Sequence, residues 1–323
     1  MTYVLLGNYG VGNLGDEALR DYFLASFPSV HWKVVSARPY DENELPRLPG
    51  GLRSLFSPWW KVIGAIAKSD GIVFGGGTLF TDIESLKACF LWYSYVLVAR
   101  LFGKDIFFAF QGVGPFRTAI GESIARAAFK HASYISTRDP KAYERVHGWM
   151  LGTSFKTTKI VQTFDPVFSF VKTQTTTNRS NNLIIIPRSN STMEFYTRAL
   201  NAAKSKKWDA ISILLMQSHE ESYASNRIKT MFDKNQKIEA YPVHTIGQLI
   251  HIVKTAGFVL TQRYHGAICA MALGVPFEAI PMVSGDKLDV VTKMDPNSCE
   301  QLVQQGRETL LAALGEKGST PQA

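Results

Sequence analysis

Short apolar runs alternate along the chain with longer segments whose apolar residues recur at helical spacing. This alternation is typical of βαβ units, in which helices pack on the faces of a parallel sheet. In the first half, the predicted strands are residues 3–7, 33–36, 71–74, 106–110 and 134–136. The predicted helices there are residues 16–27, 55–68, 84–102, 119–131 and 140–147.

A polar stretch without periodicity, KTQTTTNRSNN at residues 172–182, predicts an exposed linker, and a second α/β series follows it. The predicted strands of that series are 183–186, 211–216, 258–260 and 277–280, and its helices are 193–206, 222–233, 246–255, 264–273 and 298–314. We therefore expect two Rossmann-like domains facing a cleft, residues 1–175 and 183–314, with residues 315–323 as a disordered tail. Because ligands of open parallel sheets bind beyond the carboxyl ends of the strands, the chemistry is expected after each strand.

The composition favours anionic partners without choosing among them. The 323 residues carry a formal net charge of +8 and a pI near 9.3. No basic run, zinc-ligand spacing or recognisable binding module is present, so nucleic acid is not an expected partner. Three isolated cysteines predict neither a disulfide framework nor a thiolate metal site, and the N-terminus lacks the features of a signal peptide. We expect a cytoplasmic protein.

Two apolar segments bear on membrane contact. Residues 88–102, ACFLWYSYVLVARLF, are too short to span a bilayer and contain Arg100, so they predict a buried core helix. Residues 53–68, RSLFSPWWKVIGAIAK, combine aromatic residues with three cations. This second segment suits either a helix packed on the first domain or a peripheral contact with an anionic membrane, and both interpretations stay open.

A glycine-rich turn follows the first strand and leads through Asn13, Gly15 and Asp16 into a helix. Glycines permit positive φ and close backbone approach, and Asn13 or Asp16 suits the position that caps the helix. The turn also contains the G-x-G-x-x-G spacing of dinucleotide-binding loops. Residues 36–38 read SAR, where a ribose-binding acidic residue would be expected, so dinucleotide binding is the weaker alternative.

Two further glycine turns and an arginine follow later strands of the first domain. Gly75-Gly76-Gly77 comes after the third strand, where its amides suit an anion or let two chain segments pass closely. Gln111 and Gly112 begin a tight turn after the fourth strand. Arg138 follows the fifth, and its planar guanidinium suits a carboxylate or phosphate ligand, or an ion pair with Asp139.

Cationic residues stand at the strand ends of the second domain. Arg188 follows its first strand, and Arg263 and His265 follow its third strand at the start of a helix rich in small residues. A helix N-terminus of this kind offers free N–H groups and a partial positive charge, which makes it a good anion site. Lys287 follows the next strand, where it suits either an anion ligand or an ordinary solvated position.

Six motifs occur in a fixed order along the chain. They are GNLGDEA at residues 12–18, GGG at 75–77, QGVGP at 111–115, RD at 138–139, DP at 165–166 and RYHG at 263–266. This set resembles the polysaccharide pyruvyltransferase family, bacterial enzymes that place pyruvate ketals on sugars of exopolysaccharides, capsules and cell-wall polymers. The resemblance implies a glycosyltransferase-B-like (GT-B) fold, phosphoenolpyruvate as donor, and neither a metal nor another cofactor.

The resemblance also implies roles for particular residues. Arg263, Arg138, Arg188 and Lys287 are expected to bind the donor's carboxylate and phosphate, since clustered cations suit a ligand with close to three negative charges. His265 is expected to protonate the donor methylene. In the first domain, Asp16 is a candidate for activating the acceptor hydroxyl, with a capping role as the alternative. Asn13, Gly15, residues 75–77, Gln111 and Gly112 are expected to line the cleft.

Two other functions fit the same residues. A nucleotide-sugar glycosyltransferase of the same architecture would also use a glycine-containing helix start as its phosphate site, although residues 267–273 lack a carboxylate for the ribose and Glu278 lies just beyond. A non-catalytic sugar- or phosphate-binding homologue is the third possibility, but the retained Arg263 and His265 argue against it. The expected acceptor is a sugar, with a lipid-linked oligosaccharide among the candidates.

Overall fold

The computed structural model describes residues 1–50, 56–83, 85–157, 159–173, 178–232, 238–282 and 287–315, without the side chains of residues 218 and 219. The predicted tail after residue 315 and residues 53–55 of the aromatic segment lie outside the described residues. The chain divides into two compact units. Unit 1 comprises Met1–Val11, Leu19–Pro166 and Gln301–Ala323, and unit 2 comprises Gly12–Ala18 and Val167–Glu300.

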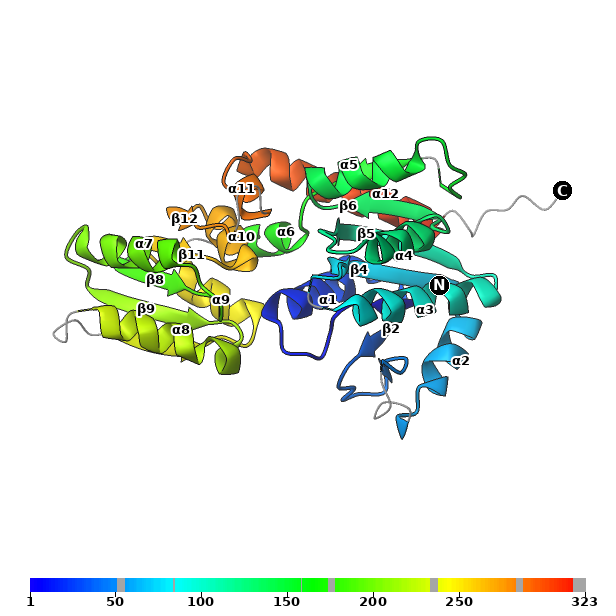
Figure 1. Cartoon of the computed structure of the whole chain (residues 1–323), viewed down its shortest axis with the longest axis horizontal. Coiled ribbons are helices and arrows are strands. Elements are labelled where there is room, and N and C mark those ends of the chain that lie inside the picture. The colour runs from blue at the N-terminus through cyan, green and yellow to red at the C-terminus, as the bar shows by residue number, and fades with distance from the viewer. Residues whose placement is uncertain are drawn as a thin grey trace. The chain divides into compact units, whose positions relative to one another are not determined.

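Unit 1 contains a seven-stranded parallel sheet in the order β3-β2-β1-β4-β5-β6-β7 (Figure 1). Its strands are β1 (Thr2–Leu6), β2 (His31–Ser36), β3 (Glu44–Pro46), β4 (Gly71–Phe80), β5 (Asp105–Val113), β6 (Tyr134–Thr137) and β7 (Ile160–Gln162). Its helices are α1 (Leu14–Ser26), α2 (Trp60–Lys68), α3 (Leu86–Leu101), α4 (Ala119–Phe129), α5 (Pro140–Met150) and α12 (Pro296–Gly315), although α1 and α12 begin in residues assigned to unit 2.

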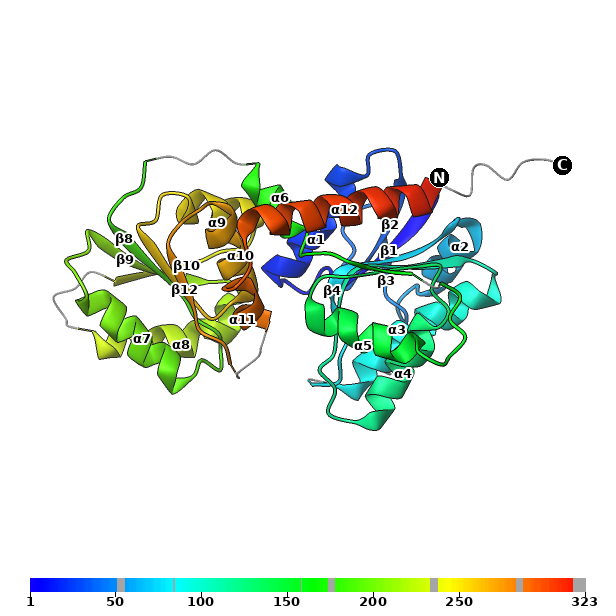
Figure 2. The ribbon, with the colours of Figure 1, turned by 90° about the horizontal axis from the view of Figure 1, so that it is seen from above.

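The two faces of this sheet are covered by different helices. Val4 and Leu6 of β1 pack in one buried cluster with residues of α2, α3, α4 and α5. Tyr3, next to Val4, faces the opposite way because side chains alternate along a strand. Its hydroxyl donates to the carbonyl of Leu314 at 3.0 Å, so α12 lies on this second face. Figure 2 shows the sheet between α1 and α12 on one side and α3, α4 and α5 on the other.

Unit 2 contains a five-stranded parallel sheet in the order β10-β9-β8-β11-β12. Its strands are β8 (Asn182–Ile186), β9 (Ala210–Leu215), β10 (Ile238–Pro242), β11 (Phe258–Thr261) and β12 (Phe277–Ala279). Its helices are α6 (Val167–Lys172), α7 (Met193–Lys204), α8 (Ser218–Met231), α9 (Ile246–Val253), α10 (Tyr264–Ala272) and α11 (Lys287–Val291). Leu183 and Ile185 pack against α7 and α8, and α10 contacts α6, α9 and the last two strands.

The units differ from the expected domains at their ends. Residues from Gln301 onward, expected in the second domain, belong to unit 1, while Gly12–Ala18 and α6 belong to unit 2. The reason for the first difference is burial, because the side chains of Leu310 and Leu314 in α12 are fully buried in the chain. A helix with an apolar face is stable only where that face is covered, and α12 covers the side of the unit 1 sheet opposite α2 to α5.

Two predictions about unit 1 are wrong. The third strand was expected to end before Gly75-Gly76-Gly77, but β4 continues through these glycines to Phe80, pairing with β5 past a register irregularity. Gln111 and Gly112 likewise lie inside β5 and not in a turn after it. Gly76 and Gly77 adopt positive φ, near 80°, within β4, a conformation that glycine tolerates where the register with β5 is irregular.

The predicted buried helix at residues 88–102 is also only partly buried. Cys89, Tyr95 and Ala99 of α3 are fully buried, but the opposite side of the helix is exposed. No helix in the part of the chain that the structure describes is long and apolar enough to cross a membrane.

Candidate functional site

The carboxyl edge of the unit 2 sheet has the geometry of a ligand site. The chain proceeds from β8 through β9 to β10 on one side and returns as β11 and β12 on the other, so the strand order reverses between β8 and β11. Open parallel sheets bind ligands at such a reversal. Arg188 lies two residues after β8 and Arg263 two residues after β11, so both predicted arginines stand at this edge.

Gln262 holds the two strand ends together. Its backbone N–H donates to the carbonyl of Ile186 at 2.9 Å, which continues the pairing of β8 and β11. Its side-chain Nε2 donates to Thr192 Oγ1 at 3.1 Å, and its Oε1 accepts from the backbone N–H of Thr192. Because Gln262 is fully buried and Thr192 caps α7, this network fixes the position of Arg188 relative to Arg263.

Arg263 is paired with a buried carboxylate inside unit 2. Its Nε donates to Oε1 of Glu221 at 2.5 Å, and its Nη2 contacts the same Oε1 and the Oε1 of Gln217. The Glu221 side chain has no exposed surface, and its Oε2 accepts from the backbone N–H of Gln217 at 2.9 Å. We expected this guanidinium to bind the donor. Its Nε and Nη2 groups instead donate to protein side chains in this structure.

Glu221 and Gln217 were not predicted as site residues. Gln217 precedes α8 and Glu221 lies in its first turn, at the carboxyl end of β9. Their position after a strand was a signal, but an acidic residue in the first turn of a helix is common because it complements the helix dipole. Only the fold brings them to Arg263.

The imidazole of His265 packs directly on Gly15. A Cβ added at Gly15 would lie 2.0 Å from Nδ1 of His265, so only glycine leaves room for this ring. Both residues belong to unit 2, since Gly12–Ala18 is assigned to that unit. The structure thus brings the predicted acid, at the start of α10, against the predicted glycine turn at the start of α1.

The segment Gly12–Ala18 begins a helix that Asn13 caps. The Oδ1 of Asn13 accepts from the backbone N–H of Gly15 at 3.1 Å, and its carbonyl accepts from the N–H groups of Asp16 and Glu17 at the same distance. Of the two capping candidates, Asn13 therefore provides the turn. Asp16 lies half-buried in the first turn of α1, in the same short segment as Gly15.

An aromatic ring connects Lys287 to His265. Lys287 Nζ lies 4.8 Å from the centroid of the Tyr264 ring, which is a cation–π contact. The Tyr264 ring meets that of His265 edge to face, with centroids 5.3 Å apart. Unit 2 therefore groups His265, Gly15, Tyr264 and Lys287 around the start of α10.

The predicted residues of unit 1 form a packed structural cluster. Arg138 is buried, and its Nη1 donates to Oδ2 of the fully buried Asp165 at 2.5 Å. Its Nη2 donates to Thr78 Oγ1 at 3.0 Å. Asp139, the expected local ion-pair partner, instead accepts the N–H of Ala142 at 2.8 Å and caps α5.

The glycines of this cluster make room for side chains. A Cβ at Gly112 would lie 2.5 Å from Thr78 Oγ1 and 3.2 Å from Arg138 Nε. A Cβ at Gly75 would lie 2.5 Å from the hydroxyl of Tyr9. Gln111, fully buried, donates from Nε2 to the carbonyls of Phe74 and Gly76 at 2.9 and 3.1 Å. At Gly75 and Gly112 the missing Cβ therefore lets neighbouring side chains approach the strand closely.

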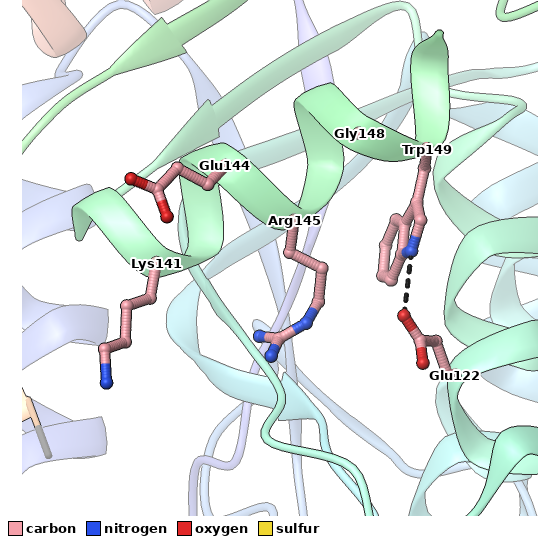
Figure 3. A pocket seen from close by; sticks show the side chains of 6 residues that line it. All are labelled: Glu122, Lys141, Glu144, Arg145, Gly148 and Trp149. Atoms are coloured by element: carbon pink, nitrogen blue, oxygen red, sulfur yellow. Dashed lines mark hydrogen bonds between the residues drawn. The ribbon is translucent and has the colours of Figure 1, made fainter. Parts of the chain in front are cut away.

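A separate shallow pocket lies on the helices of unit 1, and none of the predicted site residues lines it (Figure 3). Its lining residues are Glu122, Lys141, Glu144, Arg145, Gly148 and Trp149, from α4 and α5. Glu122 accepts from Trp149 Nε1 at 3.1 Å, and Arg145 donates to the carbonyl of Val113 while stacking over Phe116. These polar groups stabilise the helix packing, so the pocket is not the candidate site.

Solved structures with a similar fold are nucleotide-sugar enzymes. HepE from Anabaena, in complex with UDP and glucose, is 11% identical over 97% of this chain and 95% of its own, with a TM-score of 0.57. The UDP-N-acetylglucosamine 2-epimerase of Rickettsia bellii is 12% identical over 97% and 95%, with a TM-score of 0.58. The epimerase of Neisseria meningitidis, bound to UDP-GlcNAc, is 8% identical over 98% and 100%, with a TM-score of 0.56.

These likenesses establish the fold alone, an α/β architecture of two Rossmann-like domains of the GT-B type, as predicted. Among curated proteins the comparison finds no match. The sequence profile of the polysaccharide pyruvyl transferases matches residues 13–281, which include every predicted site residue except Lys287. The resemblance carried by the six motifs is thereby confirmed: the chain belongs to the polysaccharide pyruvyl transferase family, a family of transferases.

Proposed function

We propose that this protein transfers pyruvate from phosphoenolpyruvate to two hydroxyls of one sugar, forming a ketal. The observation that carries the proposal is the contact of His265 with Gly15, because it puts a proton-carrying side chain at the N-terminus of α10 and beside the segment that contains Asp16. Family membership supplies the reaction class. An acid beside an anion-binding helix start is what an enol phosphate donor requires.

The reaction balances with the donor and acceptor alone. One sugar hydroxyl adds to C2 of phosphoenolpyruvate while a proton is delivered to C3, which turns the methylene into a methyl group. The C2–O bond to phosphate then breaks, and inorganic phosphate leaves with the bonding electrons. The second hydroxyl adds to the same C2 and loses its proton, which closes the ketal.

Side chains around the start of α10 supply the roles. His265 delivers the proton to C3, and Asp16 accepts the proton from an acceptor hydroxyl. The N–H groups of α10, Arg188 and Lys287 bind the donor's carboxylate and phosphate. Arg263 also belongs to this anion site, with Glu221 and Gln217 fixing the plane of its guanidinium. Arg138 lies in unit 1, where Asp165 sets the orientation of its guanidinium.

A nucleotide-sugar transferase is the second candidate, favoured by the UDP complexes among the similar folds. Such an enzyme would need a carboxylate near the ribose. Glu278 is the nearest one to α10 along the chain after residue 273, but its Oε1 pairs with Arg198 of α7 at 3.5 Å. Since α7 packs on a face of the sheet, Glu278 is turned away from the carboxyl edge, which weakens this candidate.

The deciding experiment is a thermal-shift titration of the purified chain with phosphoenolpyruvate, UDP-glucose and GDP-mannose. We expect a concentration-dependent rise of Tm with phosphoenolpyruvate only, since a ligand that binds the native state stabilises it. Lys287→Ala should reduce that rise, and Lys229→Ala, an exposed lysine on α8, is the matched control. Stabilisation by the nucleotide sugars without any by phosphoenolpyruvate would reject the proposal.

The proposal also includes the acceptor of the pyruvyl group and the location of the protein in the cell. The acceptor is a sugar of an exopolysaccharide, capsule or cell-wall polymer, and a lipid-linked oligosaccharide fits a protein that works in the cytoplasm against the inner face of the membrane. Incubation with phosphoenolpyruvate and lipid-linked or soluble oligosaccharides, followed by mass spectrometry, would identify the acceptor by a gain of one pyruvate ketal.

A further inference from the structure

Helix α3 has apolar side chains on all sides, although only one side is buried. The buried side, with Trp92, Tyr95 and Ala99, packs on the sheet of unit 1. On the other side Phe90, Leu97 and Leu101 are exposed, Leu101 at 79%. These residues are separated by seven and four positions, so they form one stripe along the helix. A helix that is apolar all round is normally covered on all sides.

Helix α2 extends this exposed apolar surface. It packs beside α3 on the same face of the sheet, with Val62 and Ile66 buried (Figure 1). Phe56, 91% exposed, and Trp60, 59% exposed, stand at its N-terminal end. We call these exposed residues of α2 and α3 the α2–α3 surface.

The charges on the α2–α3 surface have one sign. Neither helix contains an aspartate or glutamate. Lys61 and Lys68 of α2 and Lys87 and Arg100 of α3 are all exposed. Exposed aromatic and aliphatic side chains between cations are typical of surfaces that enter the headgroup region of an anionic bilayer.

We infer that the α2–α3 surface docks unit 1 on membranes that contain anionic phospholipids. The inference rests on the proposed function, because a lipid-linked acceptor would be met at such a membrane. A second copy of this chain fits the surface less well, since a symmetric contact would bring the four cations of each copy against those of the other. An anionic lipid surface covers the apolar stripe and neutralises the cations together.

Vesicle flotation of the full chain tests the inference. We expect the protein to float with vesicles of phosphatidylcholine and phosphatidylglycerol, and not with phosphatidylcholine alone. Raising the salt concentration should weaken binding, because it screens the cations. The double variant Leu97→Glu/Leu101→Glu should bind at least about tenfold more weakly. Leu151→Glu, which changes an exposed leucine after α5, is the control and should bind like the parent.

Three results would overturn the inference: no flotation with anionic vesicles, equal flotation with neutral ones, or equal weakening by Leu151→Glu. Size-exclusion chromatography with light scattering tests whether a second copy of the chain covers the surface instead. If the parent is a dimer and the variant Leu97→Glu/Leu101→Glu is a monomer, the surface is a dimer interface. The thermal shift with phosphoenolpyruvate, measured without vesicles, is independent of all three. A negative flotation result would therefore not contradict the proposed reaction. A negative thermal-shift result would likewise not contradict membrane binding.

Discussion

Arg263 and Glu221 form a side-chain ion pair across 42 positions of the chain, with Nε and Oε1 2.5 Å apart. Arg263 follows β11 and Glu221 lies in the first turn of α8, after β9. Because β8 lies between these two strands, the pair spans the carboxyl end of β8, the strand that leads to Arg188. The pair therefore sets the geometry of the edge where we place the donor.

Replacing Glu221 should destabilise the protein strongly. Glu221→Ala leaves the largely buried guanidinium of Arg263 without its carboxylate, and removing one partner of a buried pair costs about 3–5 kcal/mol. Glu220→Ala, at the exposed neighbouring position, should change the free energy of unfolding by less than about 0.5 kcal/mol. Urea denaturation measures both, and similar values for the two variants would contradict a structural role for the pair.

Arg263→Lys should not restore function. Lysine carries the charge but cannot contact Glu221 and Gln217 from two nitrogens in one plane. We expect transfer activity to fall by orders of magnitude, about a hundredfold or more, and the thermal shift with phosphoenolpyruvate to disappear. Near-native turnover of the lysine variant would show that only the charge matters at this position.

Gly15→Ala should displace the imidazole of His265. The added methyl group would lie 2.0 Å from Nδ1, which forces the ring or the α1 segment to move. A displacement of about 1 Å in a catalytic group costs on the order of a hundredfold in turnover. Gly148→Ala is the control, because this exposed helical glycine has open space around it and alanine there should stabilise by about 0.5–1 kcal/mol without affecting activity.

His265→Gln should separate proton delivery from binding. Glutamine retains hydrogen bonding but delivers no proton, so turnover should fall about a hundredfold or more while donor binding weakens less. In deuterated water the parent enzyme should introduce deuterium into the ketal methyl group, which mass spectrometry of the product detects. Unchanged turnover in the glutamine variant would assign the acid to another residue, with Lys287 as the next candidate.

Asp82 should make stability depend on acid pH. The hydroxyl of Thr118 donates to its Oδ2 at 2.5 Å, and this bond, with the backbone N–H groups of Thr118 and Arg117, holds the pKa of Asp82 below its ordinary value of 3.8. A carboxyl group whose pKa is lower in the folded state stabilises the fold at pH values above its pKa in the unfolded state. That stability is lost as the pH falls through its pKa in the folded state. Asp82→Asn should therefore have a lower Tm than the parent at pH 7, and the difference should shrink as the pH falls below 3.8. A Tm difference that stays constant with pH would contradict this assignment.

Strong periodicity and strand-end glycines were sufficient to predict the α/β class and most helices. The strands β3, β7 and β10 were not predicted, because β3 and β7 have only three residues each and β10 is only partly buried. Local pattern also failed at Gly75-Gly76-Gly77, since glycine marks loops in sequence but here continues a strand packed under Tyr9. In each case tertiary packing decided the outcome.

The sequence proposed individual residues for the candidate site, but it did not predict which side chains pair with them. Arg138, Arg263 and His265 were identified from their positions after strands. Asp165 was noted only as part of a motif, and Glu221 was missed, because a buried ion pair joins residues far apart in sequence. The apolar sequence of α3 predicted burial, and nothing in it distinguishes the exposed stripe from the buried one.

The return of α12 to the first sheet has a consequence for how the protein is made. The face of the unit 1 sheet that contains Tyr3 is covered by α1 and α12, and the part that α12 covers stays open until residues 301–315 have left the ribosome, after all of unit 2 has been synthesised. The first unit therefore cannot complete its core during translation, although its strands are made first. Expression of residues 1–175 alone would produce a sheet that lacks the α12 part of the cover on one face, whereas a fusion that joins residues 1–166 to 301–315 through a short linker would restore α12.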